Sequence, residues 1–158
     1  MANVWILLLS LAGLVLTGID LRRKVIPNWL NLAIAVGGLA RAAETGDARI
    51  TFIASFQGAT VGAVVWMLRW LYFRWRNLQG LGLGDVKLLA ASGVWIGIAG
   101  VPVQLLVASL AALATAGLLK IAGYTIGRQT LLPFGPFLIL GLPVTLWMEE
   151  AAGLPSMP

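Results

Sequence analysis

Long apolar blocks separated by short polar breaks make up most of this chain of 158 residues. Several blocks are shorter than the roughly 20 residues that cross a bilayer as a helix, so we expect those helices to tilt or to include loop residues. The pattern predicts an all-α, polytopic membrane bundle of about six transmembrane helices, forming a single domain over residues 1–158. The six blocks are residues 4–19, 29–43, 50–73, 86–100, 103–126 and 134–148.

The composition also places the chain in lipid. Hydrophobic residues make up 59% of it and charged residues only 11%, whereas soluble domains carry about 25% charged residues. Small residues recur every four positions at Ala54, Gly58 and Gly62, and Gly93 and Gly97 repeat the spacing in the fourth block. This spacing lets helices approach closely in a membrane, so it predicts tight helix packing.

The chain contains neither cysteine nor histidine. This excludes disulfides, thiol nucleophiles, Ser-His-Asp triads and almost every type of zinc site, and we expect no metal and no cofactor. A formal net charge of +5 in a soluble protein would suggest nucleic acid as a partner. In a membrane protein, basic residues chiefly fix the orientation, so we expect a bilayer and no nucleic acid.

Basic residues collect on one side when the six blocks are threaded alternately through a membrane. The loops on that side are residues 20–28, 74–87 and 127–136. By the positive-inside rule this side is cytoplasmic, which places the N-terminus outside. Basic residues follow the first block rather than precede it, so we interpret it as a retained helix and not a signal peptide. Nine of the eleven basic residues lie in or beside these loops: Arg22, Arg23, Lys24, Arg69, Arg74, Arg76, Lys87, Lys120 and Arg128.

Two of the six acidic residues, Asp20 and Asp85, fall on the predicted cytoplasmic side, each where an apolar block meets a loop. Acidic groups near the hydrocarbon are costly, so such residues are candidates for function. Simpler roles exist for each one alone. Asp20 could pair with Arg23 or Lys24, and Asp85 could cap the fourth helix. Their joint position on one side of the membrane favours a shared chemical role.

Alternating glycines at positions 80, 82 and 84 precede Asp85. Glycine tolerates positive φ and close backbone approach, which predicts an extended or irregular segment entering the bundle. Such backbone is tolerated at membrane depth only beside protein or a water-filled cavity, the setting that a hydrolytic aspartate needs. A nucleotide-binding loop is disfavoured because Asp85 occupies the place of the third glycine of GxGxxG. Lys87 either offsets the acidic charge, holds the glycine segment, or simply extends to the membrane interface.

Three motifs occur in order along the chain: Asp20 with Ile26-Pro27-Asn28, then Gly82-Leu83-Gly84-Asp85-Val86-Lys87, then Pro133-Phe134-Gly135-Pro136. In this order they resemble the type IV prepilin peptidase family, which are membrane aspartic proteases of the GxGD type. The resemblance covers essentially the whole chain and implies that Asp20 and Asp85 are the catalytic pair. It implies supporting or substrate-groove roles for Pro27, Asn28, Gly82, Gly84, Lys87, Pro133, Phe134, Gly135 and Pro136.

Two details refine the resemblance. Presenilin-like proteases share GxGD, but here Ile19 rather than tyrosine precedes Asp20, and the third motif is not Pro-Ala-Leu. Many prepilin peptidases carry two CxxC pairs associated with methylating the new N-terminus, and this chain has no cysteine. It therefore resembles the short, peptidase-only members, and methyltransferase activity is not expected.

The resemblance implies cleavage of the basic leader peptide of a prepilin or pseudopilin, at the cytoplasmic face of a prokaryotic inner membrane. One aspartate would act as base toward a water and the other as acid. A proton- or ion-coupled transporter would also use two intramembrane acids, although transporters often show inverted repeats, which this sequence lacks. A catalytically silent membrane adaptor is the third interpretation. Loss of the leader from a prepilin would separate the first from the other two.

Overall fold

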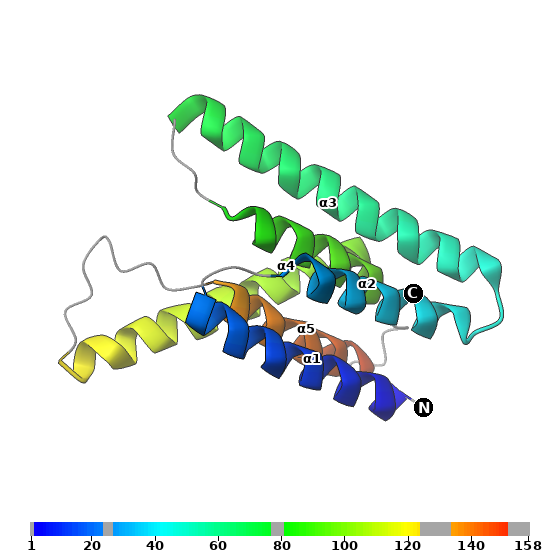
Figure 1. The fold of residues 1–158 in the computed structure, drawn as a ribbon, viewed down its shortest axis with the longest axis horizontal. Coiled ribbons are helices and arrows are strands. Elements are labelled where there is room, and N and C mark those ends of the chain that lie inside the picture. The colour runs from blue at the N-terminus through cyan, green and yellow to red at the C-terminus, as the bar shows by residue number, and fades with distance from the viewer. Residues whose placement is uncertain (1, 24–26, 77–80, 124–133, 152–158) are drawn as a thin grey trace.

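The computed structural model describes residues 2–23, 27–76, 81–123 and 134–151. These residues form five helices and contain no strand, which confirms the all-α prediction for this part of the chain. Figure 1 shows them as an elongated bundle in which α3 lies along one edge. The helices are α1 (Ala2–Arg23), α2 (Asn28–Ala43), α3 (Ala48–Arg76), α4 (Leu83–Ile121) and α5 (Gly135–Ala151).

The helix starts follow from local chemistry. Pro27 lies just outside α2 in an extended conformation, with φ −65° and ψ 135°, and α2 begins at the next residue. Between α2 and α3 the chain turns at Gly46, whose φ of 73° suits glycine. Asp47 then caps α3, because its Oδ1 accepts the backbone N–H of Arg49 at 2.8 Å. The start of α2 thus follows a proline, and the start of α3 follows a glycine turn and a side-chain cap.

Helix α4 covers both the fourth and the fifth predicted block, yet it reverses direction at Gly97. Gly97 has φ 64° and ψ −177°, which is outside the helical region. In a straight helix, residues 12 apart lie about 18 Å apart. Here the Gln104 Nε2 donates to the Ser92 Oγ at 2.9 Å, so the two parts of α4 fold back on each other. Figure 1 shows the green first part and the yellow second part running in different directions.

The fourth and fifth predicted helices correspond to the two parts of α4 on either side of this bend. The sequence places the break after residue 100, but the backbone departs from helical geometry at Gly97, where two helical parts of α4 meet. Gly97 was expected to serve close helix packing. A glycine at this spacing is compatible with close helix packing and also with a bend in the backbone. Its sequence context alone therefore does not distinguish the two roles.

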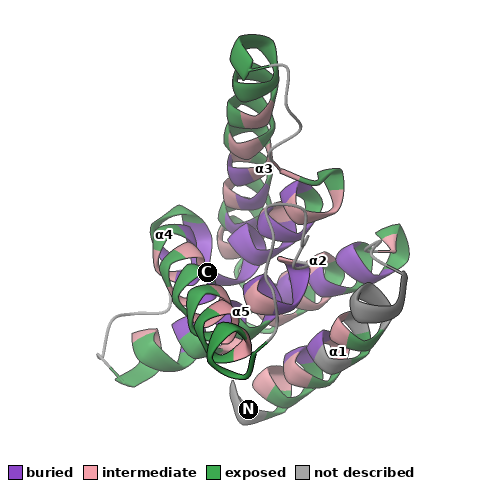
Figure 2. Cartoon of the chain, turned by 90° about the vertical axis from the view of Figure 1, so that its left-hand side faces the viewer, coloured by how far each residue is buried: buried purple, intermediate pink, exposed green. Residues whose placement is uncertain are grey.

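The first part of α4 is the centre of the bundle. Residues 91–97 are all buried, and α2, α3 and α5 pack against α4. Figure 2 shows the buried residues gathered where these helices meet, while the end of α3 is exposed. A side chain at Gly58 would overlap the Val94 side chain at 2.5 Å, and one at Gly93 would lie 3.2 Å from the Gly58 Cα. The predicted close packing of α3 on α4 is therefore confirmed at these two glycines.

The outer surface of the bundle is apolar. Leu7, Phe52 and Leu113 are each about 70% exposed (69%, 70% and 71%). Soluble monomers rarely expose contiguous apolar surface on this scale, so the exterior suits lipid rather than water. Two described helices, α3 and α4, are long and apolar enough to cross a membrane. The fold is therefore a helical bundle with a lipid-compatible exterior.

The bundle has two ends, which carry different polar groups (Figure 1). The ends of α1 and α3 and the starts of α2, α4 and α5 lie on the same side, and we call this the Asp85 end. The starts of α1 and α3, the turn between α2 and α3, and the end of α5 lie on the other side. Because the bend of α4 contacts the end of α2 through Arg41 and Trp95, we call this the Gly97 end.

Candidate active site

Asp85 lies in the first turn of α4, at the entry to the buried first part of that helix. The preceding Gly82 is extended, with φ −66° and ψ 146°, and its carbonyl accepts the N–H of Val86 at 3.2 Å. A Cβ at position 82 would lie 3.1 Å from the Asp85 Oδ2. Glycine at position 82 therefore leaves room for the carboxylate. The start of a helix also stabilises a negative charge through the helix dipole.

Gly82 and Gly84 do not use the positive φ that glycine allows. Among the described residues, the positive-φ glycines are Gly46, Gly97 and Gly123. Gly84 is helical and Gly82 is extended. Gly82 is extended, which is one of the two forms predicted for this segment, and it leaves room for the Asp85 carboxylate, while α4 begins at the next residue.

Lys87 and Asn28, both predicted supporting residues, are brought together from α4 and α2. The Lys87 Nζ donates to the Asn28 Oδ1 at 2.8 Å. This contact joins the first turn of α2 to the first turns of α4. It favours the interpretation in which Lys87 holds the site over one in which the side chain merely extends to the interface.

Asn31 is a third polar residue at this crossing, and the sequence analysis missed it. It lies one turn after Asn28 on α2, is 5% exposed, and its Nδ2 donates to the Gly84 carbonyl at 3.5 Å. Residues 28 and 31 of α2 thus contact residues 87 and 84 of α4, with Asp85 between the latter two. The available signal was an uncharged polar residue in the block 29–43, whose other polar residue is Arg41 near its end.

Arg69 of α3 completes the support of the segment before Asp85. Its Nε donates to the Leu81 carbonyl at 2.8 Å. The sequence analysis counted Arg69 only as a charge that sets membrane orientation. Trp66, Trp70 and Phe73 surround it in a hollow of about 220 Å³. Residues 81–84 are therefore held from two sides, by Arg69 of α3 and Asn31 of α2.

Asp20 lies in the last turn of α1 and not at the start of a loop, since α1 continues to Arg23. Its side chain lies outside the described part of the structure. The end of α1 and the start of α4 are at the same end of the bundle (Figure 1). The approach of the two carboxyl groups stays a prediction.

The third motif marks the start of α5. Pro133 lies outside the described residues, whereas Gly135 and Pro136 are buried at the helix start. The Phe134 carbonyl accepts the N–H groups of Phe137 and Leu138, each at 3.1 Å. The motif therefore begins a buried helix at the Asp85 end, and its predicted role in shaping a substrate groove stays a prediction.

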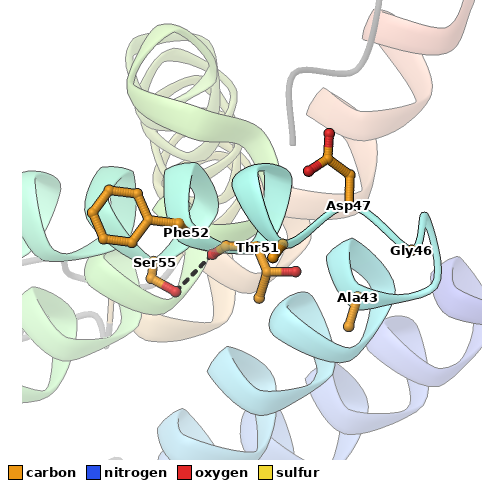
Figure 3. A pocket seen from close by; sticks show the side chains of 7 residues that line it. Ala43, Gly46, Asp47, Thr51, Phe52 and Ser55 are labelled. Carbon is orange, nitrogen blue, oxygen red and sulfur yellow. Dashed lines mark hydrogen bonds between the residues drawn. The ribbon is translucent and has the colours of Figure 1, made fainter.

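A larger hollow, of about 430 Å³, lies at the Gly97 end (Figure 3). It is formed where α2 turns into α3, and Asp47 points from that turn. Since Asp47 already accepts the Arg49 N–H as a helix cap, its carboxylate has a structural role. The 29 residues of α3 span about 43 Å and separate this hollow from the Asp85 end. Its lining residues are Ala43, Gly46, Asp47, Ala48, Thr51, Phe52 and Ser55.

Comparison with known proteins gives a consistent picture. The sequence profile of the type IV leader peptidase family matches residues 7–117, a range that includes Asp20, Asn28, Asn31, Asp85 and Lys87. No solved structure matches the chain.

Several curated relatives carry the name prepilin leader peptidase/N-methyltransferase. The protein from Xanthomonas campestris pv. campestris is 35% identical over 146 residues, which is 91% of this chain and 50% of the relative. That from Aeromonas hydrophila is 35% identical over 151 residues, 91% of this chain and 49% of the relative. That from Escherichia coli K12 is 36% identical over 136 residues, 84% of this chain and 58% of the relative. The chain thus spans about half the length of the curated relatives it matches.

Proposed function

This chain belongs to the type IV leader peptidase family, and we propose that it is a membrane aspartic endopeptidase that removes the basic leader peptide of a prepilin or pseudopilin. The observation that carries the proposal is the placement of Asp85. Its carboxylate lies at the start of the central helix, beside a glycine that leaves it room, on a segment held by Arg69 and Asn31. Such support keeps a reacting group in one orientation.

The proposed mechanism uses Asp20 and Asp85 as one unit. Two close carboxyl groups cannot both ionise cheaply, so the pair shares a single proton. The ionised member takes a proton from water, and the protonated member polarises the scissile carbonyl. The tetrahedral gem-diol then collapses as the amine leaves, without a covalent enzyme intermediate. The position of the end of α1 at the Asp85 end supports this pairing.

We further propose that the chain crosses a prokaryotic cytoplasmic membrane about six times, counting the two parts of α4 separately. The N-terminus would lie outside and the Asp85 end would face the cytoplasm. The distribution of charge supports this orientation. Arg69 and Lys87 lie at the Asp85 end, whereas Glu44, Asp47 and Glu149 belong to the Gly97 end. The positive-inside rule assigns the first set to the cytoplasm.

In this arrangement the apolar helix of the substrate lies in lipid beside the bundle, and its leader junction reaches the Asp85 end. The exposed apolar side chains of the bundle are compatible with such a neighbour. The proposal covers the peptidase reaction alone. The names of the relatives include N-methyltransferase, but these 158 residues contain no cysteine, so they lack the CxxC pairs that we associate with methylation.

The test is to mix the purified protein in detergent with a prepilin and to follow loss of the leader by mass spectrometry. We expect cleavage by the native protein. Asp85→Asn and Asp20→Asn should each reduce the rate by at least about 1,000-fold, because either change removes one member of the acid–base pair.

The matched control is Asp47→Asn at the Gly97 end, where asparagine can still cap α3 and the rate should stay within about twofold. Retention of cleavage in Asp85→Asn would contradict the mechanism. If the native protein left the prepilin intact but moved protons across a vesicle membrane, the transporter interpretation would replace the peptidase.

A further inference from the structure

Asn31 is a buried amide whose contacts contribute little to holding the fold together. It is 5% exposed, and its Oδ1 is buried without a hydrogen-bond partner in the described structure. Among the described residues, its amide Nδ2 donates to the Gly84 carbonyl at 3.5 Å. A buried amide with an unused acceptor is less favourable than an apolar side chain of the same size. Stability alone therefore does not account for asparagine at this position.

A second buried amide in the bundle provides the contrast. Gln104 also leaves its Oε1 without a partner, but its Nε2 donates to the Ser92 Oγ and to the Leu138 carbonyl, both at 2.9 Å. These two bonds join both parts of α4 to α5. Gln104 therefore has a clear role in the fold, whereas the contact of Asn31 reaches only the peptide group next to Asp85.

The acceptor of this contact matters because the peptide unit is planar. The Gly84 carbonyl belongs to the same rigid unit as the N–H of Asp85. Because Gly84 and Asp85 are in the first turn of α4, a side-chain donor on that oxygen adds to the helical bonding and further limits where the Asp85 side chain can point. One turn away, the contact from Lys87 to Asn28 fixes the other side of Asp85 against α2.

We propose that Asn31 is a positioning residue for Asp85. Its amide N–H orients the peptide between Gly84 and Asp85, and thereby the carboxylate, for attack on the scissile bond. The inference rests on the proposed peptidase function and extends it to a residue outside the three sequence motifs. A displacement of about 1 Å in a reacting group can cost roughly 100-fold in rate, so loss of this donor should be visible in turnover.

The experiment measures kcat, KM and the thermal midpoint in detergent for Asn31→Leu, with a prepilin as substrate. We expect kcat to fall about 10- to 100-fold and KM to change less than about twofold, because the reacting group is misplaced while binding is not. Gln104→Leu is the matched control. It removes another buried amide, so it should lower the thermal midpoint while kcat of the folded protein stays within about twofold.

A second variant, Asn31→Asp, keeps the size of the side chain and makes the donor depend on pH. A carboxyl group donates a hydrogen bond only when it is protonated. The kcat of this variant, divided by that of the native protein at the same pH, should therefore rise by about threefold or more as the pH is lowered from about 8 to about 5. The same ratio for Asn31→Leu should stay constant. A merely structural role would not produce this difference.

Three results would overturn the inference. One is an unchanged kcat in Asn31→Leu, and another is a rise in KM without a fall in kcat, which would make Asn31 a binding residue. The third is a ratio for Asn31→Asp that does not depend on pH. Because all ratios refer to the native protein, native cleavage with normal Asn31 variants rejects only this inference. Absence of native cleavage rejects the proposed function and this inference with it.

Discussion

The two ends of the bundle use similar polar side chains for different purposes. At the Asp85 end, Arg69 and Asn31 donate to the carbonyls of Leu81 and Gly84, which lie in or next to the segment that leads into α4. Leu81 precedes α4, so its carbonyl lies outside the helical ladder and the Arg69 donor restricts backbone that could otherwise move. Gly84 is in the first turn of α4, where the Asn31 donor adds to the helical bonding. The contacts at this end therefore position a segment.

At the Gly97 end, the polar contacts join elements that are already helical. The Trp95 Nε1 donates to the Ile34 carbonyl at 2.8 Å, and the Arg41 guanidinium lies 5.8 Å from the centre of the Trp95 ring. Trp5 of α1 packs edge-on against the same ring, with centroids 6.3 Å apart and an interplanar angle of 65°. Trp95 is thus the meeting point of α1, α2 and α4, and the contacts at this end brace the fold.

Substitutions at the two ends should therefore have different effects, on stability at the Gly97 end and on turnover at the Asp85 end. Loss of a contact at the Gly97 end should lower the free energy of unfolding and leave kcat of the folded protein unchanged. Loss of a contact at the Asp85 end should lower kcat with a small effect on stability. Three substitutions test this separation, in order of decreasing expected effect.

Gly97→Ala should destabilise the protein most, by about 2–4 kcal/mol. Its φ of 64° with ψ of −177° belongs to a region that essentially only glycine occupies. A Cβ there would also lie 2.5 Å from the Gln57 Oε1. The measurement is the denaturation midpoint in detergent. Gly117→Ala is the control, because that glycine is in the second part of α4 with no atom near its Cβ position, so alanine should be neutral or stabilising.

A large fall in kcat of the folded fraction of Gly97→Ala would contradict the expectation that changes at the Gly97 end affect stability and not turnover. It would mean that the bend of α4 is transmitted along the buried helix to Asp85. Full stability of Gly97→Ala would instead contradict the reversal of α4 at this residue.

Arg69→Met should have the next largest effect, seen in turnover. Methionine keeps much of the apolar stem but removes the donor to the Leu81 carbonyl, so the segment before Asp85 loses one of its two anchors. We expect kcat to fall about 10-fold with a shift in thermal midpoint of only a few degrees. The readout is the steady-state rate on a prepilin together with thermal unfolding.

Arg74→Met is the matched control for Arg69→Met. Arg74 is on the same helix and stacks over the ring of Trp70 at 5.6 Å, whereas the hydrogen bond to Leu81 comes from Arg69. Its kcat should stay within about twofold of the native value. If the two arginine variants lost turnover equally, general positive charge rather than the contact with Leu81 would be responsible.

The features that sequence predicted correctly depend on short-range patterns. Apolar blocks give helices because a bundle in lipid must satisfy its backbone within each segment. Small residues that repeat every four positions, such as Gly58 and Gly93 in their blocks, predict close packing because a missing Cβ lets two helices approach wherever they cross. Asn28 and Lys87 came from motifs in separate blocks, and the structure places them in contact.

The features that were missed depend on which surfaces meet. Arg69 and Asn31 acquire their roles from carbonyls 12 and 53 residues away along the chain, which no local pattern reveals. Gly97 was assigned to helix packing because its four-residue spacing from Gly93 is typical of packing positions, and the same spacing does not reveal a bend. The approach of Asp20 to Asp85 was inferred from the order of the motifs, and it remains a prediction because the side chain of Asp20 lies outside the described structure.

Trp5→Phe should have the smallest effect of the three substitutions, and that effect should be limited to stability at the Gly97 end. Phenylalanine preserves an aromatic ring near Trp95 but loses the N–H that donates to the Glu44 Oε2 at 2.8 Å. Because this hydrogen bond is exposed to solvent, its loss should cost only about 0.5 kcal/mol, and kcat should not change.

A double-mutant cycle between Trp5→Phe and Glu44→Ala isolates that contribution, since the two losses should not add if they remove the same bond. Strict additivity would show that the bond contributes nothing and that the Trp5 ring alone braces α1. A coupling of the expected size, with turnover unaffected, would show that even a weak contact at this end acts on the fold and not on Asp85. That outcome would sharpen the division between the two ends, because the weak contact of Asn31 at the other end is expected to act on turnover instead.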